Sequence, residues 1–385
     1  CQSAREAMET VDEICPTVIL QDLVMPDIDG LYMVEYFRSR EKTRDTPLIV
    51  LSAEEDAKVK AKAFALGAND YIVKLPDKIE LIARIRYHSQ AYINMLQKKA
   101  AFEALHKSKR KAEREREAAE TARKKIMASI RYAKMIQTSL LPNPENIRSI
   151  IPNSFFIWMP RDIVGGDFIY VDSFEDGFIV AVIDCTGHGV PGAFMTMIAA
   201  FGMRKIIRDE GFRDPAQILK RLNFLVKTSL HQDTDFAVSD DGLDASVVRC
   251  QSVATDNGQR TTDNGQLTFA GAKSPLIYVR DGEATFIKGD RESVGYKRSD
   301  MNFKFASHTV NICEGISFYM FSDGITDQLG GKKRRRFGNK QLKNLLKENA
   351  HLPFDEQRDI VLGAFNEHKG ENERQDDVTV VGFGF

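Results

Sequence analysis

The chain has 385 residues, which is enough for two or three domains that each bury a core. Its 54 Lys and Arg nearly balance 55 Asp and Glu, so net charge gives no reason to expect nucleic-acid or membrane partners. The five cysteines are scattered and form no CxxC pair, which favours reduced thiols in a cytoplasmic protein over disulfides or a zinc site.

No apolar run approaches the ~20 residues of a membrane span, and no signal peptide opens the chain. The first residue is Cys1 rather than Met, in what reads as the middle of a domain. We therefore expect an N-terminal piece to be absent.

Residues 1–90 alternate short apolar strands with amphipathic helices, which predicts an α/β doubly wound domain with a parallel sheet. In such sheets, functional side chains collect at the carboxyl ends of the strands. Asp22, Ser52 and Lys74 each follow a predicted strand, so we expect them to converge. A carboxylate, a hydroxyl and an ammonium suit a phosphoryl group carried on Asp22 and held by Ser52 and Lys74. A lone Lys at a strand end would instead be a solvated charge.

Three segments of this domain resemble the response-regulator receiver domain: QDLVMPDIDG (21–30), LSA (51–53) and GANDYIVK (67–74). The resemblance implies phosphorylation of Asp22 by an upstream histidine kinase or phosphotransfer protein. It also implies contacts from Ser52 and Lys74, Tyr71 as the aromatic switch residue, and Mg²⁺ in the complete receiver.

Two features depart from the receiver pattern. The family's acidic pair lies on its first strand, and nothing before Cys1 supplies it, so we expect an N-terminally incomplete receiver, about two-thirds of the domain. The family's Lys-Pro dipeptide is interrupted here as Lys74-Leu75-Pro76.

Residues 91–140 contain no Pro or Gly and are dominated by Lys, Arg, Glu and Ala. Apolar side chains recur every seven residues at Leu105, Ala112, Ala119, Ile126, Ala133 and Leu140. This repeat predicts a two-stranded coiled-coil linker and hence a homodimer, with a seam weak enough to act as a switch. The alternative is a single solvated spacer helix. Pro142 and Pro144 are expected to end the helix.

Residues 141–385 contain many short β-like runs with grouped helical stretches, which predicts an α+β domain of antiparallel sheets covered by helices. The expected strands are 154–159, 167–172, 178–183, 243–250, 266–271, 275–280, 283–288, 316–322 and 377–383. The expected helices are 190–209, 214–230, 338–349 and 354–368.

Carboxylates stand beside turns at the ends of four of these strands: Asp167, Asp184, Asp323 and Asp376, the last followed by Asp377. Oxygen ligands suit Mg²⁺ or Mn²⁺, and four such strand ends could ring a two-metal site that activates water against a phosphate ester. The alternative is that each Asp only caps a turn. His188 could be an acid or simply a turn residue.

A second resemblance, to the SpoIIE-type branch of the metal-dependent serine/threonine phosphatases (protein phosphatase type 2C class), spans residues 136–385. Its motifs are IQTSLLP (136–142), PRDIVGGDF (160–168), DCTGHG (184–189), FAGA (269–272), SDG (322–324) and DDVT (376–379). It implies a layered αββα fold of two packed antiparallel sheets flanked by helix pairs.

The resemblance also implies the chemistry. Asp184 would bridge two Mn²⁺ or Mg²⁺ ions and the Cys185 carbonyl would bind one. Asp323 and Asp376 would complete the second ion's sphere, and Asp167 would bind directly or through water. Water activated by the metals would attack phosphoserine or phosphothreonine without a covalent intermediate. Gly187, His188, Asp244 and Asp377 are secondary candidates.

The sequence therefore predicts a signalling enzyme with a receiver (1–90), a dimerising linker (91–140) and a metal-dependent serine phosphatase (141–385). By resemblance its substrate is a phosphorylated anti-sigma-factor antagonist. Phosphorylation of Asp22 would change how the linkers pack and so order or disorder the turn at 184–189. The alternative is a catalytically weak or inactive adaptor that binds a signalling partner. The basic run 332–336 could steer an acidic partner or be a solvated loop.

Overall fold

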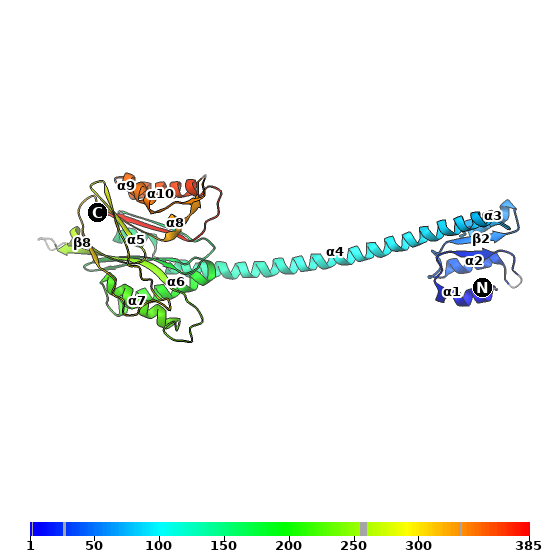
Figure 1. Cartoon of the computed structure of the whole chain (residues 1–385), viewed down its shortest axis with the longest axis horizontal. Coiled ribbons are helices and arrows are strands. Elements are labelled where there is room, and N and C mark those ends of the chain that lie inside the picture. Colours follow the sequence, from blue (N-terminus) through cyan, green and yellow to red (C-terminus); the bar gives the residue numbers. More distant parts are fainter. Residues whose placement is uncertain (2, 26–27, 255–259, 332) are drawn as a thin grey trace. The chain divides into compact units, whose positions relative to one another are not determined.

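The computed structural model describes residues 1–385 with the exception of 2, 26–27, 255–259 and 332. The chain forms two compact units, Cys1–Ala122 and Arg123–Phe385. Helix α4 (Lys78–Leu140) is 63 residues long and contributes to both units (Figure 1).

The first unit contains a three-stranded parallel sheet in the order β1-β2-β3, which confirms the α/β prediction. Its strands are β1 (Ile19–Asp22), β2 (Leu48–Ser52) and β3 (Asp70–Val73). Its other helices are α1 (Ala4–Ile14), α2 (Gly30–Ser39) and α3 (Ala57–Ala65). Met33, Phe37 and Val50 are buried in the core between helices and sheet. The peptide bond between Lys74 and Leu75 is cis.

The start of α4 is fixed to the first unit by polar contacts. Arg84 donates to Asp70 at 2.8 Å, and Tyr92 bonds Thr46 at 3.4 Å. Because no Gly or Pro occurs between residues 77 and 141, the predicted linker and the residues just before it form one continuous helix.

The second unit contains two five-stranded antiparallel sheets, in the orders β10-β9-β12-β15-β4 and β11-β8-β7-β6-β5. The strands of the first sheet are β4 (Ser154–Met159), β9 (Leu276–Arg280), β10 (Glu283–Ile287), β12 (Ser317–Phe321) and β15 (Val378–Gly384). Those of the second are β5 (Asp167–Phe174), β6 (Gly177–Cys185), β7 (Leu243–Ala254), β8 (Arg260–Ala272) and β11 (His308–Asn311).

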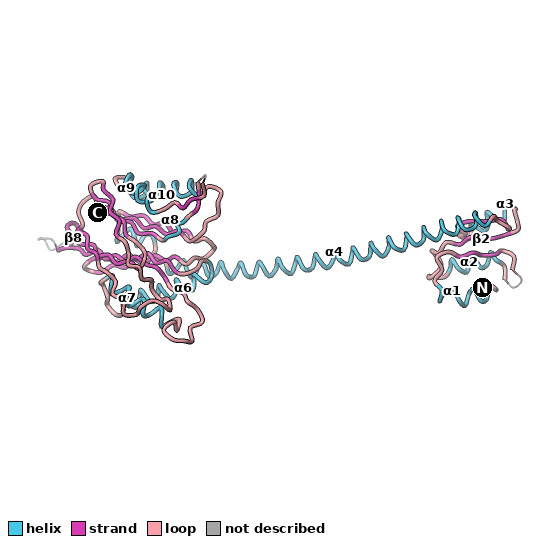
Figure 2. The backbone as a smooth tube through the Cα atoms, viewed as in Figure 1, coloured by secondary structure: helices cyan, strands magenta, loops and turns pink. Residues whose placement is uncertain are grey.

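The two sheets pack face to face and each carries helices on its outer face, so the layers are helix, sheet, sheet, helix (Figures 1 and 2). Val182 and Val248 of one sheet meet Met320 and Val381 of the other in the central core. The outer helices are α6 (Gly189–Arg204) with its π-helical extension (Lys205–Asp209), α7 (Pro215–Ser229), α9 (Asn339–Asn349) and α10 (Phe354–Lys369). This arrangement confirms the layered fold.

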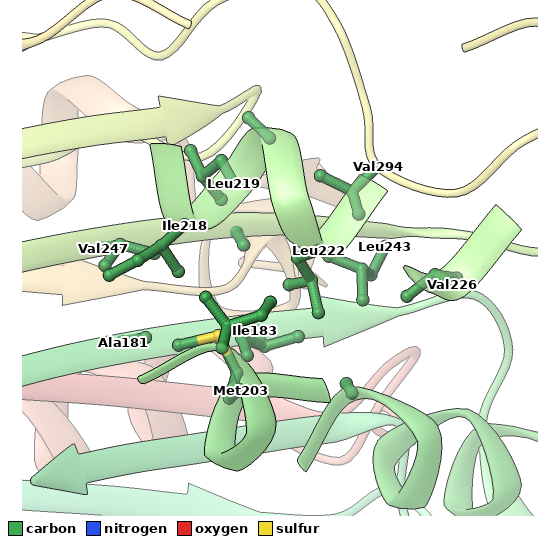
Figure 3. Close-up of a cluster of buried hydrophobic side chains, with 14 of the residues drawn as sticks. Ala181, Ile183, Met203, Ile218, Leu219, Leu222, Val226, Leu243, Val247 and Val294 are labelled. Carbon is green, nitrogen blue, oxygen red and sulfur yellow. The ribbon is translucent and has the colours of Figure 1, made fainter. Parts of the chain in front are cut away.

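Helices α6 and α7 press Met203, Leu219 and Leu222 onto Ile183 of β6 and Val247 of β7 (Figure 3). By length and composition alone, Gly189–Asp209 could cross a membrane, with a mean hydropathy of 1.3. The expectation that no run approaches a membrane span is therefore wrong on those criteria. Half of this stretch is buried inside the protein, as befits a core helix.

Four short elements lie outside the expected set, besides β11. Helix α5 (Pro144–Ile150) follows α4 directly, with Asn143 as its N-cap. Helix α8 (Asp323–Asp327) follows β12, and a small hairpin joins β13 (Leu329–Gly330) to β14 (Arg335–Arg336). Pro144 thus starts a helix, because proline is well accommodated in a first helical turn.

Candidate metal centre

Three carboxylates lie side by side across the second sheet because of its strand register. Asp167 at the start of β5 is directly opposite Asp184 of β6, and Asp184 is directly opposite Asp244 of β7. All three therefore stand at the same end of three neighbouring strands. The structure brings Asp167 and Asp184 together as expected and adds Asp244, a secondary candidate, to the row.

Further carboxylates lie next to the ends of two adjacent strands of the first sheet. Asp323 is the first residue of α8, just after β12, and Asp376 and Asp377 immediately precede β15. Strands β12 and β15 pair antiparallel, so the end of one lies beside the start of the other. The carboxylates of Asp323 and Asp376 are close enough to Asp184 to raise its pKa.

Burial and repulsion between the carboxylates raise the pKa values of the acids in this cluster. Burial first, and then the carboxylates of Asp377 and Asp376, raise the pKa of Asp167 to about 7. The pKa of Asp184 is raised well above its usual range by burial, then by Asp167 and the other carboxylates around it. Burial also raises the pKa of Asp323 to about 6, with Asp327 and Asp376 adding to the effect. These groups can all be ionised together only if cations compensate their charge.

Asp167 is held in place by residues that belong to the other sheet or directly follow one of its strands. Its side chain is 2% exposed and accepts a hydrogen bond of 2.7 Å from the hydroxyl of Ser322. The Ser322 oxygen in turn accepts the backbone N–H of Thr379 at 3.0 Å. The indole N–H of Trp158 donates to the Asp167 carbonyl at 3.0 Å. These bonds orient the Asp167 carboxylate before any ligand is present.

Asp377 has a different role from Asp376. Its carboxylate is buried and accepts the backbone N–H groups of Arg161 and Gly166. A Cβ at Gly166 would lie 2.3 Å from the Gly187 carbonyl oxygen and 2.8 Å from that of Cys185. Asp377 therefore positions the Gly-Gly turn so that it packs against the turn that follows β6.

Cys185 is the last residue of β6, and Gly187 and His188 lie in the turn that follows it. The Cys185 thiol is buried, which raises its pKa well above the usual value, and its backbone N–H donates to Gly166 at 3.1 Å. His188 is the N-cap residue of α6, and its Nδ1 lies 2.6 Å from Asp162 Oδ2. The structure thus places Cys185 and Gly187 beside the carboxylate row and pairs His188 with a carboxylate outside it.

Sequence reasoning missed several residues that support the site. Gln137, at the end of α4, donates to the Gly165 carbonyl at 2.6 Å and accepts its N–H at 3.1 Å. Ser293 donates to Asp244 at 2.6 Å, and the Tyr296 hydroxyl lies 2.6 Å from that of Thr186. Gln137 and Thr186 lie in motifs quoted above, but each bond joins residues far apart in the chain, so no local pattern could have identified their partners.

In the first unit, the Lys74 ammonium contacts the Asp22 carboxylate at the carboxyl edge of the parallel sheet. Ser52 is fully buried at the end of β2, and its hydroxyl accepts the Glu54 N–H at 3.1 Å. The Tyr71 hydroxyl donates to the Glu54 carbonyl at 2.9 Å. At this edge the carboxylate that would accept the phosphoryl group, Asp22, is therefore paired with the Lys74 ammonium. Tyr71 and Ser52 both form hydrogen bonds with the backbone of Glu54.

The family model Stage II sporulation protein E (SpoIIE) matches residues 175–385, which is more than half of the chain. The chain belongs to the SpoIIE family. The Response regulator receiver domain model matches residues 1–86 of this SpoIIE-family protein. The receiver resemblance and the phosphatase resemblance are both confirmed, and the receiver points to phosphotransfer from a kinase.

Similar solved structures and curated proteins also match separate parts of the chain. The SiaA-PP2C domain of Pseudomonas aeruginosa is 34% identical with a TM-score of 0.60, and covers 69% of this chain and 98% of that domain. Protein RcaC of Microchaete diplosiphon is 39% identical over 69 residues, 18% of this chain. RpaA of Synechocystis, a DNA-binding dual master transcriptional regulator, is 35% identical over 74 residues, 19% of this chain. The matched segments span only 10% and 31% of these two proteins.

The carboxylate cluster of this SpoIIE-family protein fits divalent metal ions by its donor chemistry. Carboxylate oxygens are the donors that Mg²⁺ and Mn²⁺ prefer, and the cluster is short of compensating positive charge. Among the residues that the structure describes, no three His, Cys, Asp or Glu side chains are already arranged to hold an ion. Metal binding would therefore require these side chains to change position.

Proposed function

We propose that this protein is a metal-dependent protein serine/threonine phosphatase that removes a phosphate from a phosphoserine of a partner protein. The observation that carries the proposal is the row of Asp167, Asp184 and Asp244, which adjoins Asp323 and Asp376 of the other sheet. A cleft of about 430 Å³ opens beside these residues and is lined by Asp184, Asp244 and Asp323. The cleft gives a phosphate monoester access to the carboxylates.

Two Mn²⁺ or Mg²⁺ ions, when bound, would supply the Lewis acidity that activates water and stabilises the developing charge on the phosphate. Asp184, Asp323 and Asp376 would hold these ions, with Asp167 and the Cys185 carbonyl as further ligands. The hydrogen bond from Ser322 keeps Asp167 in one orientation. With hydrolysis by direct attack of water, the chain needs no protein nucleophile.

By family resemblance, the partner is a small anti-sigma-factor antagonist that carries one phosphoserine, and the reaction is cytoplasmic. The test is release of phosphate from a phosphorylated protein of this type by the full-length chain, with and without Mn²⁺. Turnover that needs the metal and is lost when the central carboxylate is removed would support the enzyme. Partner binding without turnover would favour the adaptor.

We further propose that phosphorylation of Asp22 regulates this activity. The Asp22 carboxylate is already in contact with Lys74, which would become a ligand of the phosphoryl oxygens. Phosphorylation would also add negative charge next to the loop that Tyr71 bonds through Glu54. A change in the position of Tyr71 is the local event that the linker would have to transmit.

Addition of beryllofluoride, a phosphoryl mimic, should change phosphatase turnover of the full-length chain severalfold, because only a modified receiver would rearrange. The measurement is the initial rate of phosphate release with and without the mimic. Asp22→Asn is the control, since it preserves the shape of the side chain but cannot accept the mimic. Equal rates with and without the mimic in the unmodified protein would contradict the regulation.

The linker should form a dimer. Between residues 97 and 125 every side chain of α4 is exposed, and Leu105 and Ile126 of the predicted seam are 66% and 60% exposed. A helix whose side chains are exposed over so long a stretch needs another surface to stabilise it.

We therefore expect light scattering to give a mass near twice 43.4 kDa. Leu105→Glu combined with Ile126→Glu should shift the protein to the monomer, whereas exposed, off-seam Lys109→Glu should not. A monomeric unmodified protein would rule out the coiled coil in favour of a single spacer helix.

A further inference from the structure

The cleft beside the carboxylate row is also lined by basic side chains. Besides Asp184, Asp244 and Asp323, its lining includes Lys273, Lys288 and Arg291. Lys273 directly follows β8, while Lys288 and Arg291 belong to the segment that follows β10. All three are exposed to solvent. The cleft is therefore lined by both carboxylates and three cations, and we call these three cations the basic end.

The two segments that form the basic end are held together by their backbones. The Lys273 N–H donates to the Asp290 carbonyl at 2.8 Å, and the Asp290 N–H donates to the Gly271 carbonyl at 2.8 Å. A Cβ at Gly289 would lie 2.5 Å from the Ser274 carbonyl oxygen, so only glycine permits this close approach. The backbone positions from which the three cations project are thus fixed relative to β8.

The cations of the basic end form no side-chain hydrogen bonds or ion pairs with the described residues, although the charge of Lys273 offsets part of the rise that burial causes in the pKa of Asp244. Among the described residues, no side-chain hydrogen bond or ion pair involves Lys273, Lys288 or Arg291. The two other acids of the lining are engaged elsewhere. Asp290 accepts the Ala306 N–H at 2.7 Å, and Asp327 forms an ion pair with Arg336 at 3.1 Å. The basic end is therefore available to an external anion.

We propose that the basic end selects protein substrates in which acidic side chains flank the phosphoserine. The proposal rests on the phosphatase function proposed above. Two divalent ions would carry four positive charges, about as many as the carboxylates that hold them carry negative charges. The two negative charges of a phosphate monoester are then fewer than the three positive charges of the basic end, which leaves positive charge for acidic side chains next to the phosphoserine. Complementary charge of this kind raises both the encounter rate and the specificity for acidic segments.

The test compares two phosphoserine peptides, one flanked by Asp and Glu and the other by Asn and Gln at the same positions. The unmodified full-length chain should show a kcat/KM about tenfold higher for the acidic peptide, from two or three exposed ion pairs. Lys288→Glu combined with Arg291→Glu should reduce this ratio to about one or below. Because both kcat/KM values are measured on the same variant, any change in activity that affects the two peptides equally cancels in their ratio.

Lys220→Glu is the matched control, because Lys220 is an exposed lysine on α7 and does not line the cleft. It should leave the ratio unchanged. Equal kcat/KM values for the two peptides in the unmodified protein would overturn the proposal. An unchanged ratio of the two kcat/KM values in the double variant would also overturn it. That outcome includes the case in which kcat/KM falls equally for both peptides because the cations bind the phosphate itself.

A binding measurement separates this proposal from the phosphatase function. The Asp184→Asn chain, which should not turn the peptides over, should still bind the acidic peptide more tightly, and added salt should weaken that preference. Absence of any hydrolysis, with the binding preference intact, would overturn the enzyme and leave the acidic selectivity standing. Hydrolysis of both peptides without any preference would overturn the acidic selectivity and leave the phosphatase function standing.

Discussion

Asp184→Asn should lower phosphatase turnover by at least about 100-fold, because the substitution removes the central carboxylate of the row. Asparagine has nearly the same shape as aspartate but offers no negative charge to a cation. Asp184 is opposite Asp167 on one side and Asp244 on the other, so no neighbouring group can take its position. The measurement is metal-dependent phosphate release, with metal affinity determined by calorimetry.

The same substitution should leave the metal-free fold at least as stable as before. The pKa of Asp184 is raised by burial and by four neighbouring carboxylates, so a neutral side chain relieves both costs. Thermal unfolding without metal should thus show an unchanged or higher Tm, which separates loss of chemistry from loss of structure.

Asp281→Asn is the matched control for this substitution. Asp281 is an exposed residue in the turn between β9 and β10, at the opposite end of that hairpin from Lys288. Normal turnover by Asp184→Asn would refute the metal centre. Loss of partner binding alone would instead indicate the adaptor.

Local sequence patterns were sufficient for most of the fold because buried strands and amphipathic helices leave distinct signals. The run Phe178–Ile183 is apolar and ends at a carboxylate and a glycine turn, and β6 extends over it. Strand β11 was missed because, of its four residues, only Val310 is buried. Helix α5 was missed because Pro144 was interpreted as an end signal when it is the first helical residue.

The acidic residues of the site were predictable for the same reason, since each lies at a strand end beside a turn. The residues that orient them were not. The partner of Gln137 is 28 residues away in the chain, and Ser322 reaches Asp167 across 155 residues. Such contacts depend on how two sheets and their loops pack, which no local periodicity encodes.

Metal affinity should fall steeply as the pH is lowered, because protons and divalent ions compete for the same oxygens. In the metal-free protein, the pKa of Asp167 is about 7 and that of Asp323 is about 6. Below these values the carboxylates are protonated, and each ion that binds must release protons. We expect the apparent affinity for Mn²⁺ to drop up to about tenfold per pH unit for each proton released.

The stability of the metal-free protein should show the opposite trend. The Asp167 carboxyl group, whose pKa is about 7 in the folded protein against 3.8 for an unperturbed aspartate, holds its proton more tightly in the folded state. Its contribution to stability is full below the unfolded pKa and is lost as the pH rises through the folded value. Tm without metal should therefore decline between about pH 4 and pH 7, and saturating Mn²⁺ should reverse the decline. A metal-free Tm that rose steadily over this range would show that these carboxylates do not repel one another, and the argument for a cation between them would fail.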